Sequence, residues 1–344
     1  MSKLSLYRKR LALLLVCAGS LLATLQAHAA PTVLAFNLLL PPGDPFNQQV
    51  LRPWAAEVQR VTGGRVEISL PNAPVAAPEQ LWNAVIGGIV DGAYIYNGLY
   101  SRQLPLEQIT ALPFVGGTAA ATSVALWDTY KKFFAKAGEY RDVKVLALFA
   151  MPSGQIFSLS GPIVNPGSLS GRRMWVLPGD PQKMLSRSRA GVISSPAVQV
   201  SELVAGKTVD SIAGISAYNV DAFKISGYMK SETMLPGGLT TPSFSLIVNR
   251  GKWESIAPAD RKAIEAISGA AFAKRLSVID DYARQALQRA VHGGMKVVHP
   301  SNALLADLRG TSTPLVERWL ASAHAKGVNG PQALKYFETR AQAH

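Results

Sequence analysis

The sequence predicts an α/β protein built from two lobes, and three observations support this fold class. Strand-like and helix-like segments alternate along the chain. About 315 residues follow an N-terminal leader, more than one hydrophobic core usually spans. A helical stretch over residues 258–292 would be about 50 Å long, longer than one lobe is wide, and a helix of that length can join two lobes as a spine.

The leader is the first element, and it has the layout of a secretory signal peptide. Four cations at Lys3, Arg8, Lys9 and Arg10 precede an apolar run over residues 11–25 and a small-x-small triplet that ends at Ala29. The run of about 15 residues is too short to cross a membrane, which disfavours an uncleaved anchor. We therefore predict cleavage after about Ala29, a signal peptide at residues 1–29, and export to the periplasm. The single cysteine, Cys17, would leave with the leader.

The charge of the chain argues against a nucleic-acid partner. The sequence has 35 basic and 22 acidic residues, a formal net charge of +13. Removal of the leader takes away four cations and no acids. The remaining basic residues occur as scattered pairs such as Arg172-Arg173, not as the long basic runs of nucleic-acid-binding proteins. The charged fraction of 17% also excludes disorder driven by charge.

The first half of the exported chain predicts alternating elements in a clear order. We expect strands over residues 32–38, 65–70, 93–96 and 143–150, the last with both faces buried because it is apolar throughout. We expect helices over residues 47–61, 79–86 and 126–137. The first of these should be bent at Pro53 and should end at Thr62-Gly63-Gly64.

The second half repeats the alternation and ends in the long helical stretch. Strands are expected over residues 155–160, 172–176, 209–212 and 244–248, and helices over 181–189 and 201–205. The stretch over residues 258–292 begins with Pro258 in its first turn and stops at Gly293-Gly294. The alternative is two helices broken at Gly269, because glycine in a helix interior costs about 1 kcal/mol.

The sequence offers no recognisable catalytic constellation. Its four histidines after the leader, His292, His299, His324 and His344, all lie in the last fifth of the chain and form no HExxH motif. There is no nucleophile elbow, phosphate-binding loop or dinucleotide fingerprint. Asp280 and Asp281 are adjacent and would point in different directions on a helix. These absences favour binding over catalysis, so we predict a protein that is not an enzyme and needs neither a metal nor a cofactor.

Aromatic and amide side chains near the ends of the expected strands are the candidates for a binding site. Ligand pockets are mostly apolar with a few polar groups, and they form at strand ends in α/β folds. Most such side chains fill cores, so we expect about a third of the set to contact a ligand. The set is Asn37, Trp82, Tyr94, Tyr96, Asn97, Tyr100, Phe157, Trp175 and Tyr218.

Several stretches resemble the DctP-type solute-binding proteins of tripartite ATP-independent periplasmic (TRAP) transporters. Each stretch is weak alone, but their order along nearly the whole exported chain is specific. They are residues 54–58 (WAAEV), 62–68 (TGGRVEI), 88–91 (GIVD), 112–114 (LPF), 169–174 (LSGRRM), 201–202 (SE), 209–210 (VD), 248–249 (VN) with Trp253, 257–260 (APAD) and 293–297 (GGMKV).

The resemblance implies a periplasmic binding protein fold. Two α/β lobes would close over a ligand cleft and be joined by crossing strands and a long spine helix. The implied lobes are residues 30–152 plus about 241–275, and 153–240 plus about 276–344. The implied function is capture of a small organic solute, most often a carboxylate, and its delivery to TRAP membrane subunits driven by an ion gradient.

The chain departs from the family pattern where an arginine usually clamps the ligand carboxylate. Trp175 occupies that position, Gln155 aligns with a second arginine of some members, and Ser211 replaces a glycine. One hypothesis is therefore an aromatic, neutral or cationic ligand that stacks on Trp175. The alternative is that Arg173, on the same strand face, serves as the clamp for an organic acid. The predicted ligand-binding residues are Asn37, Tyr96, Gln155, Arg173, Trp175, Gly214 and Tyr218.

The sequence leaves three functional classes open, and it favours a solute receptor of a transporter. A receptor that presents its ligand to a sensor needs only the same closing cleft, and the sequence does not separate the two. An exported enzyme on the same scaffold is disfavoured because the catalytic constellations are missing.

Overall fold

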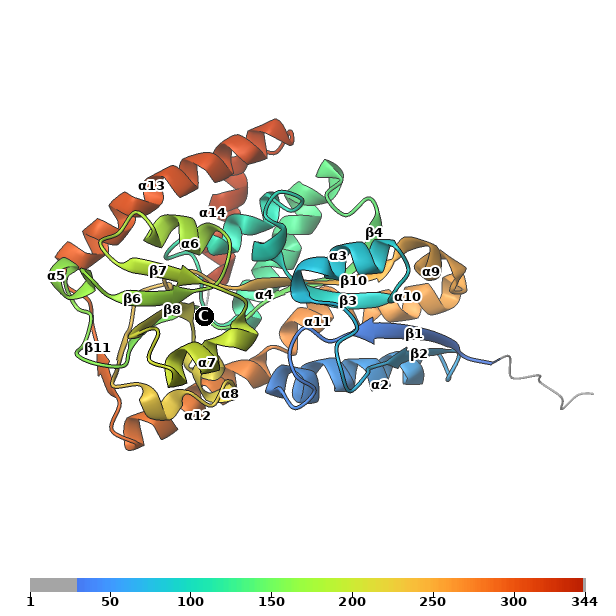
Figure 1. The fold of residues 1–344 in the computed structure, drawn as a ribbon. Coiled ribbons are helices and arrows are strands. Elements are labelled where there is room, and N and C mark those ends of the chain that lie inside the picture. Colours follow the sequence, from blue (N-terminus) through green and yellow to red (C-terminus); the bar gives the residue numbers. More distant parts are fainter. Residues whose placement is uncertain (1–29, 343–344) are drawn as a thin grey trace, which may run out of the picture.

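The structure, a computed structural model, describes residues 30–342 and contains two β-sheets, one in each half of the molecule (Figure 1). The predicted signal peptide lies outside the described residues. No helix among residues 30–342 is long and apolar enough to cross a membrane.

The first sheet has the strand order β2-β1-β3-β10-β4. Strands β1, β2 and β3 are parallel, and β10 runs antiparallel to both β3 and β4. The side chains of β4 are almost all buried, as its apolar sequence predicts. The strands are β1 (Thr32–Asn37), β2 (Val66–Ser69), β3 (Gly92–Tyr96), β4 (Val143–Ala150) and β10 (Ser243–Asn249).

The second sheet has the strand order β11-β9-β5-β8-β6-β7. Strand β6 runs parallel to β7 and β8, whereas β5 runs antiparallel to β8 and β9. The strands are β5 (Gln155–Ser158), β6 (Arg173–Val176), β7 (Gly191–Ser194), β8 (Ser211–Ile215), β9 (Ser231–Thr233) and β11 (Lys296–Val298).

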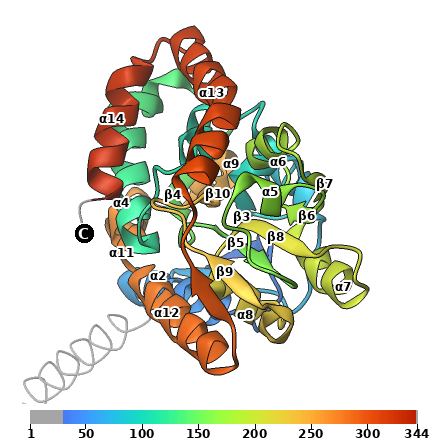
Figure 2. The same ribbon diagram turned by 90° about the vertical axis from the view of Figure 1, so that its left-hand side faces the viewer.

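Helices cover the faces of both sheets (Figures 1 and 2). They are α2 (Arg52–Val61), α3 (Leu81–Ile86), α4 (Ala119–Thr129), α5 (Pro166–Leu169), α6 (Asp180–Leu185), α7 (Val200–Ala205), α8 (Ala217–Ala222), α9 (Arg250–Ser255), α10 (Pro258–Ala266), α11 (Ala270–Lys274), α12 (Ser277–His292), α13 (Asn302–Ala325) and α14 (Gly330–Ala341).

The chain crosses between the two sheets three times, and the first two crossings lie at neighbouring places. It leaves the first sheet after β4 and returns before β10, and the two crossing segments pair through a bridge between Gly154 and Thr240. The Gly154 N–H donates to Thr240 O at 2.8 Å, and the Leu239 N–H donates back to Gly154 O at 2.7 Å. Paired crossings of this kind confirm the expected crossing strands and restrict how the lobes move relative to each other.

The spine is a bent run of three helices, α10, α11 and α12. Gly269 adopts φ +55° between α10 and α11, and an added Cβ there would lie 2.5 Å from the Trp127 ring. The break at Gly269 that the alternative interpretation expects is therefore present, because a side chain would not fit this turn. A second interruption precedes Ser277, so the stretch forms three helices and not two.

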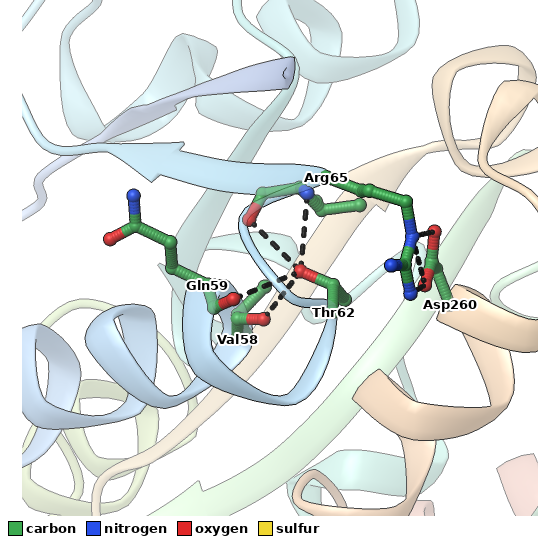
Figure 3. Close-up of polar contacts among 6 residues, drawn as sticks. Val58, Gln59, Thr62, Arg65 and Asp260 are labelled. Atoms are coloured by element: carbon green, nitrogen blue, oxygen red, sulfur yellow. Dashed lines mark hydrogen bonds and ion pairs between the residues drawn. The ribbon is translucent and has the colours of Figure 1, made fainter. Parts of the chain in front are cut away.

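The end of α2 shows how the turn signal in the sequence works. Figure 3 shows Thr62 at its centre: the hydroxyl donates to Val58 O at 2.8 Å and accepts from the Val66 N–H at 3.1 Å. Arg65 then forms a two-pronged ion pair with Asp260 at the start of α10, with Nη2–Oδ1 at 2.6 Å. The side-chain contacts fix β2 and α10 against the end of α2.

The C-terminal helices contact both halves of the molecule. Helix α13 packs near α6 of the second lobe, and α14 packs along α4 of the first. Arg340 of α14 also forms an ion pair with Asp128 of α4. The predicted lobe boundary places the whole of residues 276–344 with the second lobe, whereas α14 lies against the first.

Candidate functional site

A cavity lies between the two lobes, at the carboxyl ends of parallel strands. Its volume accessible to a water molecule is about 50 Å³, enough for a few waters in this arrangement of the lobes. Residues on the first-lobe side are Leu39, Leu40, Pro78, Tyr96, Leu99 and Phe244. Residues on the second-lobe side are Leu177, Pro178, Pro196, Ala197, Val198, Ile215, Asn219 and Phe223, and the crossing region adds Met151 and Pro242.

The lining of this cavity is almost entirely apolar. Only Tyr96 and Asn219 contribute polar side chains, and no lysine, arginine, histidine or carboxylate is among the lining residues. The rings of Tyr96 and Phe244 have centroids 5.7 Å apart, and Phe244 stacks on Phe149 with centroids 5.3 Å apart. Such a cavity suits a flat apolar group more than a solvated ion.

The lobes touch each other directly beside the cavity, so the structure shows a closed arrangement. The Tyr96 hydroxyl, at the end of β3, donates to Pro178 O, just beyond β6, at 3.2 Å. Gly179 lies so close to Gly98 that an added Cβ would come within 2.9 Å of Gly98 O. Closed lobes around a cavity can hold a small molecule away from water.

A buried tyrosine and carboxylate form a third contact across the cleft. The Tyr218 hydroxyl in α8 donates to Asp44 Oδ1 at 2.6 Å, and the Phe46 N–H donates to both partners. Burial raises the pKa of Asp44, and the hydrogen bonds from Tyr218 and Phe46 oppose this rise. Burial and the nearby Asp44 also hold the pKa of Tyr218 well above its usual range, so the hydroxyl keeps its proton.

Three of the predicted ligand-binding residues lie near the cavity wall, and Tyr96 is the one that lines it. Asn37 is buried, and its side-chain oxygen accepts from the Val75 and Ala76 N–H groups, which holds the segment leading to Pro78. Tyr218 makes the contact with Asp44 described above. Asn37 and Tyr218 therefore position parts of the site.

Gln155 and Gly214 lie where the chain crosses between lobes. The Gln155 side-chain oxygen accepts from the Leu235 N–H at 2.6 Å. Gly214 adopts φ +82°, and an added Cβ there would lie 2.8 Å from the Thr240 side chain. Neither residue is among those that line the cavity.

Trp175 and Arg173 do not line the cavity either. Trp175 is completely buried, and its indole N–H donates to Ser195 Oγ at 3.0 Å. Arg173 begins β6, at the end opposite to Leu177 and Pro178, and its exposed side chain lies 3.6 Å from Asp210. The two residues thus lie on the same strand and neither lines the cavity, although Ser195, the partner of Trp175, directly precedes Pro196 of the lining.

Sequence reasoning missed most of the lining. Of the nine aromatic and amide candidates, only Tyr96 lines the cavity, whereas Phe157 is completely buried and Tyr94 donates from inside the core to Asn47. Asn219 lies in α8 and Phe223 directly follows it, and this helix is one that the sequence pattern did not predict. The adjacent Tyr218 was the only signal near them.

The family of this chain follows from its sequence. The family described as bacterial extracellular solute-binding protein, family 7 (DctP), matches residues 36–322. The chain belongs to this family, whose members are extracytoplasmic solute receptors of TRAP transporters and not known as enzymes.

Individual proteins resemble the chain over nearly its whole length. The "outer membrane transporter protein TsaT" of Comamonas testosteroni is 38% identical over 339 residues, covering 98% of this chain and 99% of that protein. A TRAP periplasmic solute-binding protein of Bordetella bronchiseptica, solved with bound (R)- and (S)-mandelate, has a TM-score of 0.85 and 29% identity, covering 90% of this chain and 99% of the other.

A second solved structure has a similar fold and a related ligand. It is a TRAP solute-binding protein from a marine metagenome, specific for aromatic acid ligands and bound to 3-hydroxybenzoate. Its TM-score is 0.81 and its identity 25%, covering 91% of this chain and 98% of the other. These matches confirm the two-lobed α/β fold of TRAP solute-binding proteins.

Proposed function

We propose that this protein is a periplasmic receptor that captures a small aromatic solute by closing its lobes and delivers it to a TRAP membrane permease. The observation that carries the proposal is the apolar cavity that both lobes build, with aromatic rings and two polar side chains in its lining. The similar proteins with bound mandelate and 3-hydroxybenzoate support the same class of ligand.

The cavity also bears on the charge of the ligand. A dicarboxylate would bring two charges into a space whose lining offers no cation, and unpaired charges are costly to bury. Arg173 lies at the far end of β6, which favours a site without an arginine clamp. We therefore propose a solute with one ring and one polar or singly charged group.

The first test is a binding panel measured by titration calorimetry on protein purified from the periplasm. We expect benzoate, (R)-mandelate or 3-hydroxybenzoate to bind with a negative heat-capacity change, because apolar surface is buried, and succinate to give no heat of binding. Tight binding of succinate together with no binding of any aromatic probe would contradict the proposal.

Removal of the Tyr218 hydroxyl should weaken the binding of every ligand by a similar factor. The hydrogen bond from Tyr218 to the buried Asp44 joins the two lobes and forms only when they close. Tyr218→Phe removes this bond, so it disfavours closure without changing the residues that line the cavity. A hydrogen bond to a charged group is worth about 1.5–3 kcal/mol, so we expect affinity to fall about 10- to 100-fold.

The matched control for this variant is Tyr282→Phe. Tyr282 in α12 donates to Asp221 at 2.7 Å, a bond of the same kind outside the contact between Tyr218 and Asp44. Calorimetry should show nearly unchanged affinity for this control. Equal losses in both variants would mean that the Tyr218 bond has no special part in closure.

A further inference from the structure

We infer that Asn219 orients the bound solute, by donating hydrogen bonds from its amide nitrogen to an acceptor atom on the ligand. The inference rests on the proposed function, because it assigns a specificity-determining residue within the same cavity. It is argued from the geometry of α8 and from the polar groups that line the cavity.

The orientation of the Asn219 amide is fixed by its neighbours. The Ser216 backbone N–H donates to one terminal atom of the side chain at 3.1 Å, and the Ser216 hydroxyl donates to the same atom at 3.1 Å. A backbone N–H can only donate, so the atom that it faces must be the oxygen. The NH2 group is therefore the other terminal atom.

This NH2 group has no hydrogen-bond partner among residues 30–342. Asn219 is only 8% exposed, and it lines the cavity. An amide NH2 group without a protein partner, on a side chain that lines the cavity, can donate to an acceptor on a ligand there. The other polar lining side chain, Tyr96, already donates its hydroxyl proton to Pro178 O. Within the described part of the chain, Asn219 is thus the one lining side chain that has donor groups without a hydrogen-bond partner.

The chemistry of the donor narrows the class of ligand. An amide NH2 can satisfy a carboxylate or a carbonyl oxygen, but it has nothing to accept a proton from an ammonium group. Of the ligand classes that the sequence leaves open, the aromatic acids and neutral aromatic acceptors fit Asn219, and the cations do not. The ring of such a solute would lie against the apolar lining, with its oxygen toward α8.

Asn219→Asp is the sharpest test, because Asp has nearly the same shape. One of its oxygens can still accept from Ser216, so the start of α8 is kept, but the terminal atom that was the NH2 group becomes an acceptor. At pH 8 we expect benzoate to bind about 10- to 100-fold more weakly than to the wild-type protein. Asn219→Leu offers neither a donor nor an acceptor, so its affinity for benzoate should also fall. This variant replaces Asn219→Asp in the test if the Asp variant does not fold.

Ser216→Ala is the matched control. It removes one of the two donors to the Asn219 oxygen, while the Ser216 backbone N–H still donates to it, so benzoate affinity should change less than about threefold. Unfolding temperatures without ligand check that each variant is folded.

The outcomes separate the inference from the proposed function. Binding of benzoate by the wild-type protein with unchanged affinity in both Asn219 variants would overturn the role of Asn219 and leave the aromatic receptor standing. Preferential binding of benzylamine over benzoate by the wild-type protein would also overturn it. Failure of the wild-type protein to bind any aromatic probe would overturn the proposed function and the inference with it.

Discussion

Trp175→Ala should lower the free energy of unfolding by about 3–5 kcal/mol, the range for removal of a large buried ring. Trp175 is completely buried on β6, where Ile193 of β7 and Ile212 of β8 are its partners in register. The change also leaves Ser195 without the indole N–H that it accepts from. Denaturation by urea, followed by circular dichroism, measures the effect.

Arg173→Ala is the control on the same strand. Its side chain is exposed, and its ion pair with Asp210 at 3.6 Å belongs to the surface kind, so the loss should stay below about 1 kcal/mol. A loss of similar size in Trp175→Ala would mean that the ring contributes little to the core.

Trp175→Phe then tests the hypothesis that this ring stacks on the solute. Phenylalanine keeps much of the packing and removes the larger aromatic face. A folded variant with weakened affinity for benzoate would support stacking, whereas unchanged affinity would favour a role confined to the core of the second lobe.

Gly179→Ala should weaken the binding of every solute about 10- to 100-fold, because it obstructs lobe closure. Gly179 has φ +113° and ψ −148°, a conformation that is essentially restricted to glycine. Its new Cβ would lie 2.9 Å from Gly98 O and 3.3 Å from Gly98 Cα, on the opposite lobe. Backbone atoms cannot move aside as the end of a flexible side chain can, so the lobes would have to stay further apart.

Gly171→Ala controls for backbone strain. Gly171 also has a positive φ, +73°, but an added Cβ there meets nothing within 4 Å. We expect both variants to lose some stability and only Gly179→Ala to lose affinity in calorimetry. An equal loss of affinity in the two would show that strain, and not contact between the lobes, is responsible.

The sequence predicted those elements best whose patterns are local. The apolar run of β4 and the Thr62-Gly63-Gly64 turn both lie where expected, because burial on both faces and a glycine stop each leave a short, direct signal. The helix expected to start at residue 126 begins at Ala119 instead. Alanine and threonine there gave no apolar periodicity, although Thr118 caps the helix by accepting from the Ala121 N–H.

The site was harder to predict than the fold, because its lining comes from segments far apart in the sequence. Leu39, Asn219 and Phe244 meet at one cavity only after both sheets have formed and the lobes have closed. The family resemblance could point to β6, where we predict that Trp175 takes the place of an arginine. It could not show that the cavity wall is made by the next residues along, Leu177 and Pro178.

The position of β10 has a consequence for the order in which the chain can fold during synthesis and export. Strands β3 and β4 do not pair with each other, because β10 lies between them. The first sheet therefore stays incomplete until residues 243–249 have emerged, long after the rest of its strands. By then the residues of β5 to β9 have already emerged. The centre of the first sheet is thus the last part of that sheet to form, and a chain whose residues 243–249 have not yet emerged has no complete first sheet to obstruct its passage.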